Sequence, residues 1–183
     1  ILVSFHPVTR ESNTTKEYFK QLISTLEKFS DIQFIFTSPN PDPENHIIIN
    51  ILKKYLRKNK NFISVKTFGQ KNFFSVLKIV DGIIGNSSSG ILEMPSFKKG
   101  TINIGNRQKG RIQAASIINC PPKSLSIERS IRKLYSKSFR KKISSSKNLY
   151  YKKKTAKKIV KVVSNLPLNN LIIKKSYASS KIN

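Results

Sequence analysis

The sequence predicts an α/β fold, a doubly wound parallel sheet of the Rossmann-like type. Short continuous apolar runs alternate with segments of helical periodicity, and polar or glycine-rich turns follow several of the runs. Strands that alternate with helices of roughly 10 to 15 residues are typical of βαβ units, which build parallel sheets with right-handed crossovers. The length of 183 residues suits one such domain with a C-terminal appendix.

The elements follow from local patterns along the chain. Continuous apolar runs predict strands at 1–5, 32–36, 62–65, 82–84, 101–104 and 116–119. Apolar residues at helical spacing predict helices at about 14–29, 43–55 and 72–80, from about residue 90, from residue 124, and at 151–165. Thr14 with Glu17 forms a candidate capping box, and Asp42 is a candidate N-cap before Pro43. The Ser/Lys-rich stretch 136–147 is expected to be a connector.

The chain is strongly basic, with 35 Lys and Arg against nine Asp and Glu, a net charge of +26. Residues 101–183 hold 21 of the basic residues and one acid, Glu128. The helix expected at 151–165 carries an apolar stripe surrounded by lysines. Its basic side is either a solvated face or a surface for polyanions. Because no aromatic-interleaved basic motif, zinc spacing or helix-turn-helix pattern accompanies the lysines, we do not expect a nucleic-acid partner.

Other features of the composition limit the function classes. No apolar stretch reaches the roughly 18 to 20 residues that cross a bilayer, so no membrane association is expected. Cys120 is the single cysteine, which excludes an intramolecular disulfide and a multi-cysteine metal site. We therefore expect no metal or other cofactor, and a cytoplasmic location. The chain enters a strand at residue 1, and this indicates a fragment of a longer protein.

Ligands of an open parallel sheet bind outside the carboxyl ends of the strands, so the residues that follow each strand are the informative ones. The turn 85–90 (GNSSSG) offers small residues, hydroxyl donors and a helix start that favours an anion. It is either a phosphate site built on Ser87 and Ser88 or an ordinary strand-to-helix turn. It is not a Walker A loop, since GxxxxGK[ST] is absent.

Three further residues are candidates for the site. Glu93 could accept both hydroxyls of a ribose, or it could be a helix acid facing solvent. Arg107 could close a cationic rim over a diphosphate together with neighbouring basic residues, or lie in a solvated loop. His6 could act as acid or base, hold a phosphate, or be structural.

At these residues the sequence resembles the hydrolysing UDP-N-acetylglucosamine 2-epimerases. The matching stretches are 5–9 (FHPVT), 38–42 (SPNPD), 81–93 (DGIIGNSSSGILE) and 102–111 (INIGNRQKGR). The non-hydrolysing relatives carry a basic run after the first strand and a Ser-Gly-Gly turn at the phosphates. The residues here therefore favour the hydrolysing branch.

The resemblance implies the C-terminal lobe of a two-lobed, GT-B-like enzyme that makes amino sugars for nonulosonic (sialic-type) acids. UDP would lie on this lobe, and the sugar would face the missing amino-terminal lobe. Carried over from the family, Ser87 and Ser88 hold the diphosphate, Glu93 the ribose, and Arg107 the nucleotide side of the pocket. Asn40 and Phe73 line the uridine end, and His6 matches the active-site histidine.

The implied reaction removes the proton at sugar C2 with loss of UDP, and water then adds to the glycal to leave the free 2-epimer. The carboxylates that act as acid and base in the family come from the missing lobe, so this chain alone is expected to be inactive. The resemblance also implies a homo-oligomer for the complete enzyme.

These observations divide the chain into a UDP-binding lobe at 1–122, basic C-terminal helices at 123–168 that pack on the lobe, and a disordered tail at 169–183. Two alternative functions remain. The lobe could bind the donor of a GT-B glycosyltransferase, where the serine turn and the glutamate would do the same work. The chain could also be a basic polyanion-binding domain driven by residues 123–161.

Overall fold

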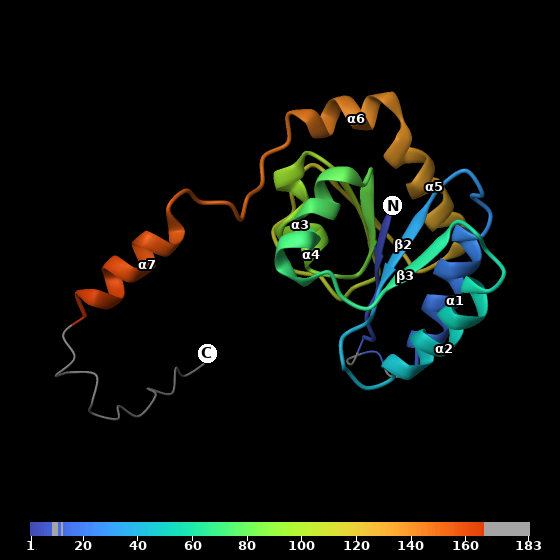
Figure 1. Ribbon diagram of the computed structural model, residues 1–183. Helices are drawn as coiled ribbons and strands as arrows, with labels where there is room; N and C mark the ends of the chain where they lie inside the picture. The colour runs from blue at the N-terminus through green and yellow to red at the C-terminus, as the bar shows by residue number, and fades with distance from the viewer. Residues whose placement is uncertain (9–10, 12, 167–183) are drawn as a thin grey trace, which may run out of the picture. The chain divides into compact units, whose positions relative to one another are not determined.

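The computed structural model describes residues 1–8, 11 and 13–166. The chain divides into two compact units, Ile1–Tyr151 and Lys152–Asn183. In the first unit six strands form one parallel sheet in the order β3-β2-β1-β4-β5-β6 (Figure 1). The strands are β1 Leu2–Ser4, β2 Phe34–Thr37, β3 Phe62–Val65, β4 Gly82–Gly85, β5 Gly100–Ile104 and β6 Ile117–Cys120. The predicted doubly wound parallel sheet is confirmed.

Helices cover both faces of this sheet (Figure 1). The α-helices are α1 Thr15–Leu26, α2 Asn45–Leu56, α3 Gly69–Ile79, α4 Ser89–Leu92, α5 Ser124–Tyr135, α6 Lys137–Ser144 and α7 Thr155–Ser164, and a 3-10 helix, η1, spans Met94–Phe97. Successive residues of a strand point to opposite faces, so each strand contributes to two apolar cores. In β4, Ile84 enters the larger core beside α1, α2 and α5, and Ile83 enters the smaller core, which contains Leu77 of α3 and Met94 of η1.

The strand order reverses at β1. This strand pairs with β2 on one side, where Leu2 faces Ile35, and with β4 on the other, where Ser4 faces Gly85. The chain connections run in opposite directions from this point, which opens a crevice between the βα turns at the carboxyl ends of β1 and β4. The fold therefore positions the turns after β1 and β4 side by side.

Both predicted N-caps differ from the structure. Thr14 precedes α1, but its hydroxyl donates to the Glu11 carbonyl at 2.8 Å and caps no helix amide. Helix α2 begins at Asn45 instead of near Pro43, because Glu44 adopts a left-handed conformation with φ of 68°. The local sequence thus indicated the helices correctly and their first turns incorrectly.

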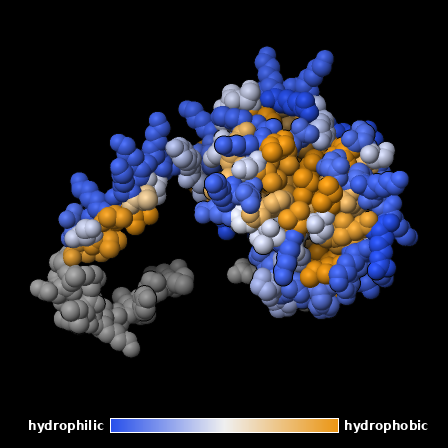
Figure 2. Space-filling model, in the orientation of Figure 1, coloured by the Kyte–Doolittle hydropathy of each residue, from blue (hydrophilic) through white to orange (hydrophobic). Residues whose placement is uncertain are grey.

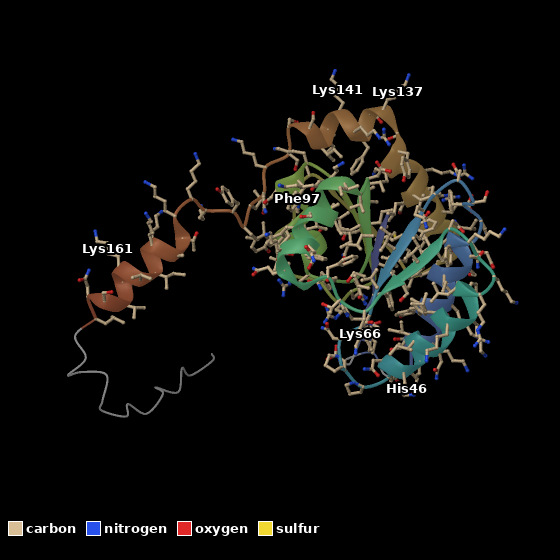
Figure 3. All side chains as sticks on the ribbon, in the orientation of Figure 1. His46, Lys66, Phe97, Lys137, Lys141 and Lys161 are labelled. Atoms are coloured by element: carbon tan, nitrogen blue, oxygen red, sulfur yellow. The ribbon has the colours of Figure 1, made fainter. Side chains whose placement is uncertain are left out.

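Two predictions for the chain after residue 90 also differ from the structure. The helix expected from about residue 90 is only four residues of α4 followed by η1, because Pro95 has no amide hydrogen to continue an α-helix. The expected connector 136–147 contains helix α6, which the Ser136 hydroxyl caps by accepting from the Phe139 amide at 3.3 Å. Phe139 and Ile143 are buried one turn apart, whereas Lys137 and Lys141 project outward (Figure 3).

Apolar side chains remain exposed near β3 and α3. Ile63 of β3 is 47% exposed, and Ile79 at the end of α3 is 80% exposed. Figure 2 shows a broad apolar area on the face of the first unit that it displays. Surfaces of this kind usually serve as contacts with another folded part.

The second unit contains α7, which confirms the helix predicted at 151–165. The prediction that it packs on the lobe stays a prediction. The tail predicted at 169–183 lies outside the described residues.

Candidate functional site

A cavity of about 390 Å³ lies at the carboxyl edge of the sheet. Four residues singled out in the sequence line it: His6, Asn40, Phe73 and Ser87. These residues come from the turns after β1 and β2, from α3, and from the turn after β4. The parallel sheet therefore brings together side chains that are up to 81 positions apart in the sequence.

Sequence reasoning missed several residues of the same cavity. Ser4 and Thr37 are the last residues of β1 and β2, and Lys66 directly follows β3 (Figure 3). The rule that strand ends carry the ligand site would have identified all three if it had been applied to every strand.

His6 is almost completely buried, and both of its ring nitrogens have polar neighbours. Its side chain is 6% exposed, and its Nδ1 accepts a hydrogen bond from the Asn40 backbone amide at 3.0 Å. Its Nε2 lies 3.4 Å from the Ser4 hydroxyl. The histidine thus joins the ends of β1 and β2 at the cavity.

Asn86, which was not singled out in the sequence, fixes the backbone of His6. Its Oδ1 accepts from the His6 amide at 2.7 Å, and its Nδ2 donates to the His6 carbonyl at 2.8 Å. Its own carbonyl accepts from Gln108 Nε2 at 2.8 Å and from Arg107 at 3.3 Å. Asn86, which is fully buried, therefore links the turns after β1, β4 and β5.

The serine turn leaves two backbone donors available, one on Ser87 in the cavity lining and one on Ser88, which is outside that lining. The Ser87 hydroxyl accepts from the Ser89 amide at 3.4 Å and the Ser87 carbonyl from the Gly90 amide at 3.3 Å, and the Ser88 carbonyl accepts from the amides of Ile91 and Leu92. Within the described part of the chain, the amides of Ser87 and Ser88 have no hydrogen-bond acceptor. Because α4 is only one turn long, these free amides favour an anion more than the helix dipole does.

Arg107 and Glu93 lie outside the lining of this cavity. Arg107 lines an adjacent cavity of about 590 Å³ with Lys109 and Arg111. Glu93, at the end of α4, lines a groove of about 460 Å³ with aromatic residues that include Phe74 and Phe97. Its Oε2 is buried without a hydrogen-bond donor among the described residues. A buried carboxylate oxygen without a donor is costly, which makes it a candidate for ligand hydroxyls.

Charges and burial keep His6 neutral. Burial, assisted by the nearby Arg107 guanidinium, lowers the pKa of His6 from 6.5 to about 4, and Asp42 opposes the shift. Since the neutral ring accepts at Nδ1, its proton is on Nε2.

The lowered pKa predicts that the fold loses stability in mild acid. Between pH 6.5 and about 4 the unfolded chain binds a proton at His6 that the folded chain does not, so the free energy of unfolding falls as the pH falls through this window. Replacing His6 with asparagine should shrink the difference in that free energy between pH 7 and pH 4.5 by about 2 to 3 kcal/mol.

Urea unfolding at the two pH values measures this difference. His46→Asn, at an exposed position on α2, controls for the loss of an imidazole elsewhere (Figure 3). An unchanged pH dependence in His6→Asn would contradict the neutral, buried histidine.

Two further findings concern other classes of site. In residues 1–8, 11 and 13–166, no group of three or more His, Cys, Asp or Glu side chains is arranged to hold a metal ion. No helix among them is long and apolar enough to cross a membrane.

A family model described as UDP-N-acetylglucosamine 2-epimerase matches residues 1–164. The chain belongs to this family. Membership in the UDP-N-acetylglucosamine 2-epimerase family confirms the resemblance that the four sequence motifs carried.

Curated relatives in this family are about twice as long as the chain or longer. "Polysialic acid biosynthesis protein P7" of Escherichia coli is 34% identical over 163 residues, which cover 88% of this chain and 41% of the relative. "GDP/UDP-N,N'-diacetylbacillosamine 2-epimerase (hydrolyzing)" of Campylobacter jejuni is 39% identical over 141 residues, 76% of this chain and 36% of the relative. The chain thus spans less than half the length of these relatives.

Solved structures confirm the fold. The UDP-GlcNAc 2-epimerase of Neisseria meningitidis bound to UDP-GlcNAc superposes with a TM-score of 0.72 at 13% identity and covers 90% of this chain and 44% of its own. The Methanocaldococcus jannaschii enzyme in complex with UDP-GlcNAc and UDP gives a TM-score of 0.70 at 16% identity, with 89% and 44% covered. The epimerase-family chain therefore has the fold of one lobe of a GT-B-type enzyme.

Proposed function

We propose that this chain is the nucleotide-binding half of a hydrolysing UDP-N-acetylglucosamine 2-epimerase. The observation that carries the proposal is the cavity lined by His6, Asn40, Phe73 and Ser87 at the switch point of the sheet. In an open parallel sheet this is where nucleotides bind. Family membership and the hydrolysing activity in the name of the Campylobacter jejuni relative support the hydrolysing reaction.

The chemistry of the residues matches the parts of a UDP-sugar. The free amides and hydroxyls of Ser87 and Ser88 would hold the diphosphate, and Arg107 would add a positive charge on the nucleotide side. The unpaired Oε2 of Glu93 would accept ribose hydroxyls. Phe73 and Asn40 would bound the uridine end.

The reaction we propose eliminates UDP from a UDP-amino sugar with removal of the proton at C2. Water then adds to the glycal, so that a UDP-sugar and water give UDP and the free 2-epimer. The described lining of the cavity holds no Asp or Glu that could act as acid or base. Those groups would come from the other half of the enzyme, and this chain would stabilise the charge on the departing diphosphate.

Replacing Glu93 with alanine should weaken UDP binding by about tenfold or more, because hydrogen bonds to a charged group contribute about 1.5 to 3 kcal/mol each. Ser88→Ala should weaken it about threefold to tenfold. Calorimetric titration with UDP at about 150 mM salt measures both effects while it screens nonspecific attraction to the lysines.

Glu17→Ala on the exposed face of α1 is the matched control, since it removes the same charge away from the cavity and should leave the affinity unchanged. A wild-type chain that does not bind UDP, or equal affinities for all variants, would contradict the proposed function. Binding of a polyanion with a steep salt dependence and no effect of UDP would instead favour the polyanion-binding alternative. The family match already favours an epimerase over the glycosyltransferase alternative.

A further inference from the structure

Three polar groups at the cavity form successive hydrogen bonds whose donor-to-acceptor direction is fixed. The series begins at the backbone amide of Asn40, which donates to Nδ1 of His6 at 3.0 Å. A backbone amide can only donate, so Nδ1 must be the acceptor and the proton of the neutral ring must be on Nε2. Geometry thus selects one tautomer of His6.

The direction continues to Ser4. His6 Nε2 lies 3.4 Å from the Ser4 hydroxyl oxygen, and a protonated Nε2 can only donate to it. The Thr37 hydroxyl has two acceptors within reach, the same Ser4 oxygen at 3.2 Å and the Val3 carbonyl at 3.4 Å, and the nearer one is Ser4. Because the oxygen of Ser4 accepts from both neighbours, its own proton must point to a third partner.

That third partner is best placed in the cavity. Ser4 is 6% exposed and lines the cavity together with Ser87 and Ser89. It faces Gly85 in the sheet register, and its carbonyl accepts from the Asn86 amide at 3.1 Å. Ser4 therefore lies beside the turn whose free amides favour an anion.

The backbone of His6 is fixed at the cavity, and two charged groups act on its ring. Asn86 bonds both the amide and the carbonyl of His6, at 2.7 and 2.8 Å. The charged groups that act on the ring are Arg107 from the turn after β5 and Asp42 from the loop after β2. Burial and Arg107 lower the pKa of His6 to about 4, which keeps the ring neutral near pH 7.

We propose that Ser4 is a further ligand-binding residue, whose hydroxyl donates to a diphosphate oxygen of the bound nucleotide. His6 is the positioning residue: its protonated Nε2 donates to the Ser4 oxygen, so that the Ser4 proton is directed to the ligand. The inference rests on the proposed function. It also assigns His6 a role different from that of a base, because both ring nitrogens are engaged and the ring has no free lone pair.

The first test compares UDP affinities by calorimetry at about 150 mM salt. Ser4→Ala should bind UDP about tenfold more weakly, since a hydroxyl that donates to an anion forms a charge-assisted hydrogen bond. Ser130→Ala is the matched control: it removes a hydroxyl that is as buried as that of Ser4, at 6% exposed, but lies on α5 outside the lining of the cavity, so its affinity should stay within about twofold of wild type.

The outcomes separate this inference from the proposed function. If Glu93→Ala weakens UDP binding while Ser4→Ala binds like wild type, the role of Ser4 is overturned and the proposed function stands. If the wild-type chain does not bind UDP, both are overturned.

The second test needs no substitution at the buried Ser4. Long-range ¹H–¹⁵N NMR of the wild-type chain at pH 7 should show His6 protonated at Nε2 alone, before and after addition of UDP. His46 is the other histidine, and a His46→Gln variant assigns the two signals. A His6 protonated at Nδ1, or a mixture of tautomers, would overturn the proposed direction.

Discussion

Replacing Gly85 with alanine is expected to prevent the first unit from folding stably. Gly85 ends β4 with φ of 140°, a conformation that residues with a Cβ rarely adopt. A Cβ built there would overlap the carbonyl oxygen of Ser4 and lie 2.6 Å from its carbonyl carbon. Because both atoms belong to the backbone of the adjacent strand, no side-chain movement relieves the clash. We expect a loss of about 4 kcal/mol or more in the free energy of unfolding, measured by urea titration with circular dichroism.

Gly110→Ala is the control for this variant. Gly110 also has a positive φ, of 85°, but a Cβ there would meet no atom of the described residues within 4 Å. Its replacement should lower the free energy of unfolding by about 1 kcal/mol, because only the backbone conformation becomes unfavourable. Similar unfolding midpoints for the two variants would contradict the packing of β4 against β1.

Replacing Asn86 with alanine should destabilise the fold by about 3 kcal/mol. The substitution would leave the amide and the carbonyl of His6 buried without their hydrogen-bond partners, and each such group costs about 1 to 3 kcal/mol. The same urea titration measures the loss.

Asn59→Ala provides the comparison. The side-chain amide of Asn59 also makes two hydrogen bonds, to Glu27 and to the Tyr55 carbonyl, but near the surface, where water can replace them. We expect a loss of about 1 kcal/mol or less there. Equal losses for the two asparagines would mean that the Asn86 contacts hold no buried backbone in place.

The strands were predictable because their physical cause is local. A strand buried on both faces of a parallel sheet is a continuous apolar run, and β4, which is buried at every residue, was predicted at 82–84 and spans Gly82–Gly85. The helix ends were not predictable, because each depends on the backbone conformation or the side chain of a single residue. The left-handed Glu44 delays α2, and Ser136 caps a helix that its lysine-rich surroundings concealed.

The candidate site was predictable only in part, for a similar reason. The position of Ser87 after a strand indicates a ligand turn from sequence alone, and the cavity contains it. The bracing role of Asn86 depends on contacts with His6, 80 positions away, and no local pattern records such a distance. Glu93 shows the opposite difficulty, since its place in the motif is clear but its side chain lines the neighbouring groove.

The central position of β1 also affects the order in which the protein assembles. The pairs between β1 and β4, and the bonds between His6 and Asn86, close a loop of 80 residues. Closing so long a loop loses conformational entropy before these contacts contribute any stability. Each βα unit, in contrast, can form from neighbouring residues. During synthesis the cavity therefore cannot exist until β4 has left the ribosome. A nucleotide that binds the finished cavity would selectively stabilise chains that have completed this last pairing.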